Sequence, residues 1–538
     1  MTLTLPERAH VLVIGAGASG AVVTRRLAEA GFRVVCLEQG DWHNASDYPD
    51  QDSPWELLLT EQWHPDPNIR GLAEDYPCEV SDAEISPLMF NGVGGSTIHY
   101  SGIWSRLTPS DFRVRTLDGV ADDWPISYEE LLPYYERLDV DIGVAGLGGD
   151  PAYPPGTPPP LPAHPIGEHG RRAAQGMNRL GWHWWPGTNA IASRPYGRLA
   201  QCQRRATCVT GCPTGAKAST DLTHWPVALR HGARLVTGAR VREILLDAKG
   251  RGRGAVYVDR AGHEHLQEAD VIVVAANGIG TPRLLLLSAS NRFPSGLANS
   301  SGMVGKQLML HPAATVLGVY EDELQSWLGP AGQLIGSMEF YETDPSRGFS
   351  RGAKWDAIPG FGPQLLLGRL PVDDTWGTSI HESVRRLVGR AFDWFITVED
   401  LPNEENSVSL DPVLADRDGI PAPRITYRLS ENSRAALDFN IACAVDAHDA
   451  SGAVQTIVSR VHADCGWHLM GTARIGSDPA SSVCDPFGRT HDVANLYVVD
   501  GSTFVTSGAT NPTATICAFA LRCAEHIIDM AGSQEIPS

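Results

Sequence analysis

The sequence is poor in basic residues and in aromatic residues. Lysine and arginine together number 43 against 63 aspartates and glutamates, so the formal net charge is −20, and aromatic side chains make up 7% of the chain. A chain this acidic repels the phosphates of nucleic acids and the headgroups of anionic membranes. We therefore expect no nucleic-acid partner and no docking on anionic lipid.

Long apolar runs are also missing. No uninterrupted apolar stretch reaches the about 20 residues that a membrane-spanning helix needs. The first residues, MTLTLPERAH, show neither the basic start nor the apolar segment of a secretory signal. The 10 cysteines are scattered, unlike those of a secreted disulfide scaffold. We expect a cytoplasmic protein with no membrane insertion.

A chain of 538 residues exceeds what one simple core usually supports, so we expect more than one lobe. Strand–turn–helix patterns occur near both ends, over 11–40 and 495–530. Between about 312 and 460 the pattern becomes irregular, with short strands and many turns. The segment 151–165, PAYPPGTPPPLPAHP, is too rich in proline for a helix or a sheet interior and is predicted to be an extended loop.

The first chemical motif is Gly15-x-Gly17-x-x-Gly20, which lies between a predicted strand and a predicted helix. Gly15 permits a tight turn, Gly17 permits close approach of a pyrophosphate, and Gly20 lets the helix pack on the strand. Glu38 ends the next predicted strand, where it can bind a ribose hydroxyl and would repel the 2′-phosphate of NADP. The motif predicts a dinucleotide site but does not separate FAD from NAD.

Further segments carry a family resemblance. They are Asn91-Gly-Val-Gly94-Gly95-Ser96-Thr-Ile-His99-Tyr100, then Gly280-Thr281-Pro282-Arg-Leu-Leu-Leu-Leu-Ser288, and a C-terminal set of His468-Leu-Met-Gly471-Thr472, Val499-Asp500-Gly501-Ser502 and Thr510-Asn511-Pro512-Thr513. With the glycine motif they resemble the glucose–methanol–choline (GMC) family of FAD-dependent oxidoreductases. The resemblance is strongest to bacterial gluconate and glucose dehydrogenase flavoprotein subunits and to bacterial pyranose and glycoside oxidases. Ala289 departs from the second signature, which usually carries glycine there.

The resemblance implies an α/β fold, in which a Rossmann-like FAD-binding domain carries an inserted α+β substrate domain built on an antiparallel sheet. The expected ranges are 1–311 for the first part of the FAD-binding domain, 312–460 for the substrate domain, and 461–538 for the C-terminal part with the catalytic pair. The first part includes the loop 151–165 and a cysteine segment, 202–213.

The resemblance places the catalytic base at His468 and its partner at Asn511. A neutral imidazole can take the hydroxyl proton of an alcohol while a hydride leaves for flavin N5. The amide of Asn511 can hold the same oxygen by a hydrogen bond. Many family members have a second histidine at this position, so His468 is expected to carry the proton alone. His99, His311 and His462 are weaker candidates, and His311 is expected to be structural.

The resemblance also implies contacts with FAD. Gly94 and Gly95 let the backbone pass close to the cofactor. The helix that starts at Pro512 would place its positive end near flavin N1. The expected cofactor-binding residues are Gly15, Gly17, Ala18, Ser19, Gly20, Glu38, Gly94, Gly95, Ser96, His99, Val241, Asp500, Gly501, Asn511, Pro512 and Thr513. His99 resembles the histidine that bonds covalently to the flavin in pyranose oxidases, while related dehydrogenases have a histidine in this region without the bond.

The cysteines of Cys202-x5-Cys208-x3-Cys212-Pro213 stand close together in the sequence. Thiolates at such spacing can hold an iron–sulfur cluster. The segment resembles glucose dehydrogenase flavoprotein subunits, in which this spacing binds a [3Fe-4S] cluster. The alternatives are reduced structural cysteines, a zinc site without an obvious fourth ligand, and a disulfide.

The implied reaction is the FAD-dependent oxidation of an alcohol to a carbonyl. A ring hydroxyl of a sugar or glycoside is the first expectation and an aryl or alicyclic alcohol the second. The segment Trp182-His183-Trp184-Trp185 is either a stacking surface for such a ring or ordinary packing. A flavin-binding protein without turnover is the third alternative, and the presence of His468 and Asn511 argues against it. The electron acceptor is expected to be oxygen, a quinone or a redox protein.

Overall fold

The glycine-rich N-terminal segment forms the first unit of a mixed sheet, in which most strand pairs are parallel. The computed structural model describes residues 5–50, 54–370 and 376–532. In it β1 (Arg8–Ile14), α1 (Ala18–Glu29) and β2 (Val34–Leu37) follow one another, as the sequence predicts. Four apolar residues of β1 are fully buried, which is typical of a strand covered on both faces.

Both ends of the chain build this sheet. Among the described residues it has seven strands, in the order β7-β2-β1-β10-β9-β8, with β18 paired to β10. The remaining strands are β7 (Arg234–Val236), β8 (Arg240–Leu246), β9 (Gly252–Val258), β10 (Glu264–Val274) and β18 (Leu496–Val498). β10 runs parallel to β1 on one side and to β18 on the other. The C-terminal segment is therefore part of the same layer as the glycine motif.

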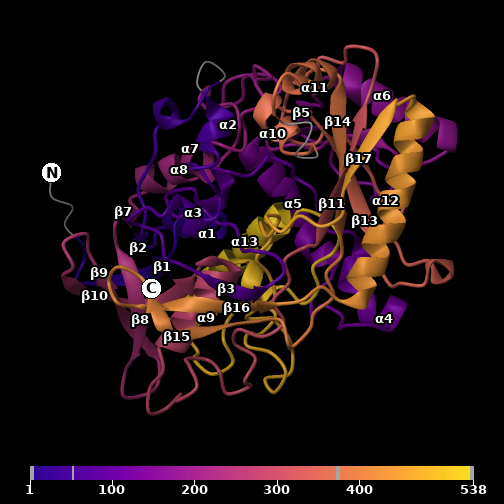
Figure 1. The fold of residues 1–538 in the computed structure, drawn as a ribbon. Helices are drawn as coiled ribbons and strands as arrows, with labels where there is room; N and C mark the ends of the chain where they lie inside the picture. Colours follow the sequence, from indigo (N-terminus) through magenta and orange to yellow (C-terminus); the bar gives the residue numbers. More distant parts are fainter. Residues whose placement is uncertain (1–4, 51–53, 371–375, 533–538) are drawn as a thin grey trace.

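Helix α13 (Thr513–Gly532) follows β18 and packs against both α1 and α5 (Tyr128–Ile142). Figure 1 shows α13 in the middle of the molecule, between the strands of the first sheet and those of a second one. This position brings the start of α13 close to both layers.

The second sheet is antiparallel. Among the described residues it has six strands, in the order β17-β11-β14-β13-β12-β6. They are β6 (Trp185–Pro186), β11 (Ala313–Val319), β12 (Ile335–Ser337), β13 (Ala353–Ile358), β14 (Ala391–Val398) and β17 (Gln455–Ser459). Helix α12 (Glu431–Ser451) packs on β11 and β14, and α6 (Gly167–Leu180) packs on α12. The expected α/β fold with an inserted antiparallel sheet is confirmed.

The second sheet does not follow the expected domain boundaries closely. Strand β6 comes from residues 185–186, well before the range 312–460. Strands β15 (Ser407–Ala415) and β16 (Pro421–Tyr427) fall inside that range but pair with β3 (Glu79–Ala83) in a separate sheet. The boundaries themselves stay a prediction, and their outer ends, 1–4 and 533–538, lie outside the described residues.

Helix α9 (Asn277–Leu287) begins earlier than expected. From the sequence alone, a proline followed by the apolar run Leu284–Leu287 predicts a helix with Pro282 in its first turn, but Pro282 lies inside the helix. Proline has no N–H to donate to the carbonyl four residues back, which is that of Gly278. The hydroxyl of Thr472 donates to this carbonyl at 2.7 Å instead. A residue of the C-terminal signature thus makes the internal proline tolerable.

The other elements are short. The helices are α2 (Trp55–Leu58), α3 (Pro67–Arg70), α4 (Val114–Asp118), α7 (Thr220–Thr223), α8 (Trp225–Arg230), α10 (Pro363–Leu367) and α11 (Ser379–Leu387), and the strands are β4 (Ala145–Gly146) and β5 (Leu161–Pro162). The short β5 is the only regular element within 151–165, so the predicted extended loop is confirmed for a segment that is described throughout.

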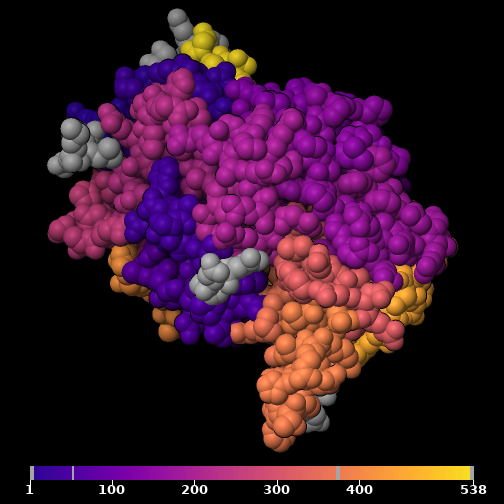
Figure 2. Space-filling model, turned by 90° about the horizontal axis from the view of Figure 1, so that it is seen from above, coloured from indigo at the N-terminus to yellow at the C-terminus, as the bar shows by residue number. Residues whose placement is uncertain are grey.

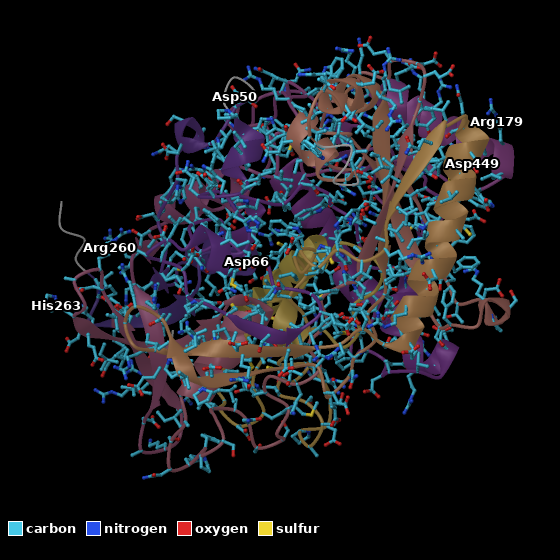
Figure 3. All side chains as sticks on the ribbon, viewed as in Figure 1. Asp50, Asp66, Arg179, Arg260, His263 and Asp449 are labelled. Atoms are coloured by element: carbon cyan, nitrogen blue, oxygen red, sulfur yellow. The ribbon has the colours of Figure 1, made fainter. Side chains whose placement is uncertain are left out.

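The outer surface shows where these layers end. In Figure 2 the orange segment that contains α11 projects from the body of the molecule. In Figure 3, Arg260 and His263 mark the outer end of the β9–β10 hairpin, and Arg179 and Asp449 mark the opposite edge, where α6 meets α12. Across the residues that the structure describes, we find no helix both long and apolar enough to cross a bilayer.

Candidate active site

A cavity of about 570 Å³ lies between the two sheets. Its walls come from the glycine turn after β1, the end of β2, the segment around His99, the start of α9 and the segment from His462 to Ile516. The cavity therefore reaches from the predicted dinucleotide motif to the predicted catalytic pair. A volume of this size is typical of a small-molecule site.

Most of the predicted site residues line this cavity. They are Gly15, Gly17, Ala18, Ser19, Glu38, Gly95, Ser96, His99, Val241, His468, Asp500, Gly501, Asn511, Pro512 and Thr513. Gly20 and Gly94 do not line it. A Cβ on Gly20 would lie 2.0 Å from the carbonyl oxygen of Gly15, so this glycine serves the packing of α1 on the turn. Gly94 adopts a φ of 101° and shapes the backbone just before Gly95.

The glycine turn fits a pyrophosphate. Gly15 has a φ of 102°, and a Cβ there would lie 2.4 Å from the carbonyl oxygen of Ala275. Gly17 caps α1 without any side-chain hydrogen bond, so no side chain occupies the first N–H groups of the helix. Ala18 and Ser19 line the cavity at this helix end. Free N–H groups at the positive end of a helix form a ready anion site.

Glu38 lies at the end of β2, as predicted for a ribose-binding carboxylate. It accepts hydrogen bonds from the backbone N–H groups of Ala16 at 2.7 Å and Gly40 at 2.9 Å. Burial raises the pKa of Glu38 to about 6. These backbone bonds hold the carboxylate at the cavity wall.

Asp500 forms more hydrogen bonds with other protein groups than the sequence suggested. One carboxylate oxygen accepts from the N–H of Asn277 at 3.1 Å and the hydroxyl of Thr281 at 2.6 Å. The other accepts from the N–H of Ser502 at 2.9 Å. Asp500 therefore fixes the start of α9 next to the turn that follows β18. A direct contact of Asp500 with the cofactor stays a prediction.

His468 and Asn511 meet at the cavity wall near the start of α13. The amide nitrogen Nδ2 of Asn511 lies 3.5 Å from Nε2 of His468. Desolvation lowers the pKa of His468 well below its usual value, and the nearby His311 and Lys354 lower it further. A neutral imidazole with an accessible nitrogen can act as a general base. The structure thus brings together the two side chains that the sequence predicted as a pair.

Two neighbours of this pair were missed or misjudged from the sequence. His311 was expected to be merely structural, yet it lines the cavity, and its Nδ1 lies 2.8 Å from Nδ1 of His468. Lys354 was not considered at all, and its Nζ lies 3.3 Å from Oδ1 of Asn511. Nothing in the sequence of β13 predicts that Lys354 lies beside Asn511. His311 could have been suspected from its residue type, because histidine is common in active sites.

His99 lines the cavity and is hydrogen-bonded through one ring nitrogen. Its Nδ1 lies 2.8 Å from the carbonyl oxygen of Val209, so the neutral ring carries its proton there. Its Nε2 is buried and has no hydrogen-bond partner among the residues that the structure describes. Burial lowers the pKa of His99 well below its usual value. The covalent link of His99 to flavin stays a prediction.

The three clustered cysteines lie together, but not as a metal site. Cys202, Cys208 and Cys212 surround a cavity of about 20 Å³, which is room for roughly one water molecule. Burial raises the pKa of Cys208 to about 12 and also raises that of Cys202, which favours protonated thiols. Over the described ranges, no group of three His, Cys, Asp or Glu side chains is placed to hold a metal ion.

The structure therefore does not support the iron–sulfur cluster or the zinc site, and it shows these thiols as free rather than as a disulfide. The segment instead supports the cavity wall. The carbonyl oxygen of Cys208 accepts from the buried Lys217, and that of Val209 pairs with His99. Of the alternatives from the sequence, the reduced structural cysteines fit best.

The tryptophan segment also has a structural role. Trp182 packs edge-on against Phe340 and Trp355, with ring centroids 4.9 and 6.1 Å apart. The indole N–H groups of Trp184 and Trp185 donate to Asn178 and Leu147. None of these tryptophans lines the cavity, so the proposed stacking surface is wrong and the packing alternative holds.

Beyond the catalytic pair the cavity is mainly apolar. This end is lined by Leu59, Ile103, Ile358, Phe361, Leu365 and Phe395. Glu56 holds this wall in place, because its carboxylate accepts from the N–H groups of Gly362 at 3.0 Å and Gln364 at 3.2 Å, at the start of α10. Thr397 lines the same space, and its buried hydroxyl has no hydrogen-bond partner among the described residues.

Models of known families match three stretches of the chain. The GMC oxidoreductase models match residues 172–313 and 402–520. An NAD(P)-binding Rossmann-like domain matches residues 13–58.

Relatives match almost the whole length. A 2-methyl-1,2-propanediol dehydrogenase of Mycolicibacterium austroafricanum is 43% identical, over 97% of this chain and 96% of its own. A 6‴-hydroxyparomomycin C oxidase of Streptomyces lividus is 33% identical, over 96% of this chain and 91% of its own. The large subunit of fructose dehydrogenase of Gluconobacter japonicus is 29% identical, over 97% and 98%.

Solved structures share the fold. A formate oxidase of Aspergillus oryzae superposes with a TM-score of 0.66 at 16% identity, covering 99% of this chain and 100% of its own. The glycine turn, the cavity and the full-length relatives together define a flavin-dependent alcohol oxidoreductase, whose cofactor is FAD. The chain belongs to the GMC oxidoreductase family.

The glycine turn gives a direct test of cofactor binding. Gly15→Ala adds a Cβ at 2.4 Å from a backbone oxygen, whereas Gly31, with a φ of 88° at the other end of α1, has nothing within 4 Å of such an atom. We expect Gly15→Ala to lose most bound FAD. Gly31→Ala should keep it and lose only about 1 kcal/mol of stability. Flavin absorbance per chain and urea unfolding measure both; equal flavin content in the two variants would contradict the assignment.

Metal analysis tests the cysteine segment. Because the cavity between the three thiols is so small, anaerobically purified protein should contain flavin but no stoichiometric iron. Iron near about three atoms per chain, removed by Cys208→Ser, would show that the cluster exists after all.

Proposed function

We propose that the protein oxidises a small alcohol with a second hydroxyl group, using His468 as the base and FAD as the hydride acceptor. The observation that carries this proposal is one cavity lined by His468, Asn511 and Thr397, in which the buried Thr397 hydroxyl has no partner among the described residues. Alcohol oxidation itself is the activity of the family. The choice of substrate and the residue roles are the new part.

The cavity suits the cofactor at one end and the alcohol at the other. The glycine turn, Glu38 and the start of α13 would hold FAD, which supplies a hydride acceptor when bound. His468 takes the hydroxyl proton on Nε2. Asn511 donates a hydrogen bond from Nδ2 to the same oxygen and keeps it in place as the carbonyl forms. The apolar wall excludes water from the reacting carbon.

Thr397 is linked to this pair through a neighbouring strand, and we propose that one small substrate touches both. In the sheet, Thr397 of β14 pairs directly with Lys354 of β13, and the ammonium of Lys354 contacts Asn511. A buried hydroxyl without a partner is unfavourable, by about 1–3 kcal/mol. A second hydroxyl of the substrate would satisfy it.

The relatives agree with this substrate class. One is named for a branched diol and others for aminoglycosides and fructose, which all carry several hydroxyl groups. The small apolar walls favour a short branched diol. The sugar or glycoside expected from the sequence is the second candidate, supported by the names of the aminoglycoside oxidases. The aryl or alicyclic alcohol has less support.

The acceptor and the location stay predictions. Oxygen, a quinone or a redox protein could reoxidise the flavin, and the cytoplasmic location follows only from the sequence pattern. The absence of turnover, the third alternative, is disfavoured by the aligned His468 and Asn511.

Anaerobic mixing with alcohols tests the reaction. We expect 2-methyl-1,2-propanediol, named in one relative, to bleach the flavin band of the wild-type protein. His468→Ala should keep its flavin and lose about a hundredfold or more in the rate of reduction. Undiminished bleaching in that variant would sink the assignment of the base, and bleaching by dithionite alone would favour a protein without turnover.

The role of Thr397 is tested by a matched pair of variants. Thr397→Val removes the hydroxyl at similar size, and Thr397→Ser keeps it. We expect Thr397→Val to raise KM for the diol by about tenfold while leaving isobutanol unaffected, and Thr397→Ser to resemble the wild type. An equal effect of Thr397→Val on both alcohols would show that Thr397 does not bind a second hydroxyl.

A further inference from the structure

We propose that His311 is a positioning residue that fixes the tautomer of His468, so that the proton-accepting nitrogen of His468 always faces the substrate. The proposal rests on the proposed role of His468 as the base. It concerns the contact between the side chains of His311 and His468, which both line the cavity. The sequence predicted only a structural role for His311.

The hydrogen bonds determine where each proton sits. Nε2 of His311 bonds to the carbonyl oxygen of Gly508, which can only accept, so neutral His311 carries its proton on Nε2. The Nδ1 of His311 is then a lone pair, and it lies 2.8 Å from Nδ1 of His468. His468 must donate from Nδ1. Its Nε2 is therefore the unprotonated nitrogen, on the side of Asn511.

The opposite arrangement would be costly. If His468 carried its proton on Nε2, the lone pairs of the two Nδ1 atoms would face each other at 2.8 Å. The alternative is that His311 changes its tautomer and carries its proton on Nδ1, which leaves the carbonyl oxygen of Gly508 without a donor. An unmade hydrogen bond at a buried group costs about 1–3 kcal/mol. Such a penalty leaves the productive tautomer of His468 in large excess.

The backbone at His311 is held for this purpose. His311 adopts a φ of 56°, in the left-handed region that few residues other than glycine enter. The residues just before it are fixed, because Met309 pairs with Met470 and the N–H of Leu310 donates to Asp400 at 2.9 Å. Strain that the surroundings hold in place is often found where it serves function.

A second contact orients the other member of the pair. The ammonium of Lys354, paired with Asp356 at 2.5 Å, donates to Oδ1 of Asn511 at 3.3 Å. The oxygen of the Asn511 amide thus faces Lys354, and its Nδ2 faces His468 and the substrate. Both catalytic side chains are therefore oriented by neighbours that do not touch the reacting carbon.

The proton balance follows from this arrangement. The O–H bond of the alcohol breaks and its proton joins Nε2 of His468, while the hydride with its electron pair leaves the carbon for the flavin. His468 becomes a cation with protons on both nitrogens. His311 still accepts from Nδ1 and stabilises that cation, whereas Lys354 opposes it. Other charged or titratable groups near this end of the cavity are Asp356, His462, Asp464, Arg369 and Cys465, whose thiol donates to the carbonyl oxygen of His311.

Three variants of His311, whose new side chains are similar in shape to one another, test the proposal. His311→Asn keeps a neutral acceptor at the position of Nδ1, His311→Leu has none, and His311→Asp places an anion there. The readouts are flavin content, thermal melting, and the rate and KM of anaerobic flavin reduction by the diol across pH. Asparagine also tolerates the positive φ better than most residues.

We expect His311→Asn to stay within about threefold of the wild-type rate and His311→Leu to fall by about tenfold or more with little change in KM. His311→Asp should raise the acid-limb pKa of the rate profile, because an anion stabilises the protonated His468. Where His311→Leu does not fold, the comparison of the asparagine and aspartate variants decides alone.

Full activity of a folded His311→Leu protein would overturn the proposal. So would an unchanged acid limb in His311→Asp, or an asparagine variant that loses as much rate as leucine while keeping flavin and melting temperature. Failure of His468 itself is seen separately, since undiminished reduction in His468→Ala would remove the base on which this inference rests.

Discussion

The parallel pairing of β10 with β1 on one side and β18 on the other is the constraint on which the site depends. Ile14 aligns with Val274, and Val274 aligns with Val498, so the three strands end at the same edge of the sheet. The glycine turn, the start of α9 and the turn at Asp500 leave the sheet together at that edge. In open α/β sheets this edge is where ligands bind. Residues from the two ends of the chain thus meet at one cofactor site.

The second constraint is the exclusion of water around the catalytic pair. His468 is enclosed by protein apart from the cavity, and its pKa is lowered by desolvation, by His311 and by Lys354. A base that stays neutral at working pH is available in every turnover. The buried Thr397 hydroxyl and the Nε2 of His99 have no protein partner among the described residues, and both residues line this cavity.

The fold and much of the site could be predicted from the sequence, since they rest on local patterns. A glycine turn after a strand or a His-x-x-Gly-Thr segment is visible in a few residues. The roles of His311, Lys354 and Thr397 could not be predicted in this way. They depend on strand pairing and on carbonyl groups that are far away in the chain. The alternation of Lys354 and Asp356 on β13 shows that they share a face, but not which face.

Two alternatives that the sequence left open, and the start of one helix, depend on contacts with distant segments. The cysteine and tryptophan segments contain residue types that suit a cluster or a sugar, yet the chain packs them behind the cavity wall. The shift of the start of α9 to Asn277 depends on Thr472, whose hydroxyl replaces the bond that Pro282 cannot make. A prediction from the sequence of the helix alone could not take account of Thr472, because this donor belongs to another segment.

The most direct test of the account is the pH dependence of anaerobic flavin reduction in the wild-type protein with a saturating vicinal diol. The pKa of His468 lies well below the usual 6.5. Reduction should therefore stay fast at mildly acidic pH and fall only when the pH drops below the lowered pKa of His468. A rate that already falls as the pH drops towards neutrality would contradict a partly desolvated, neutral His468 acting as the base.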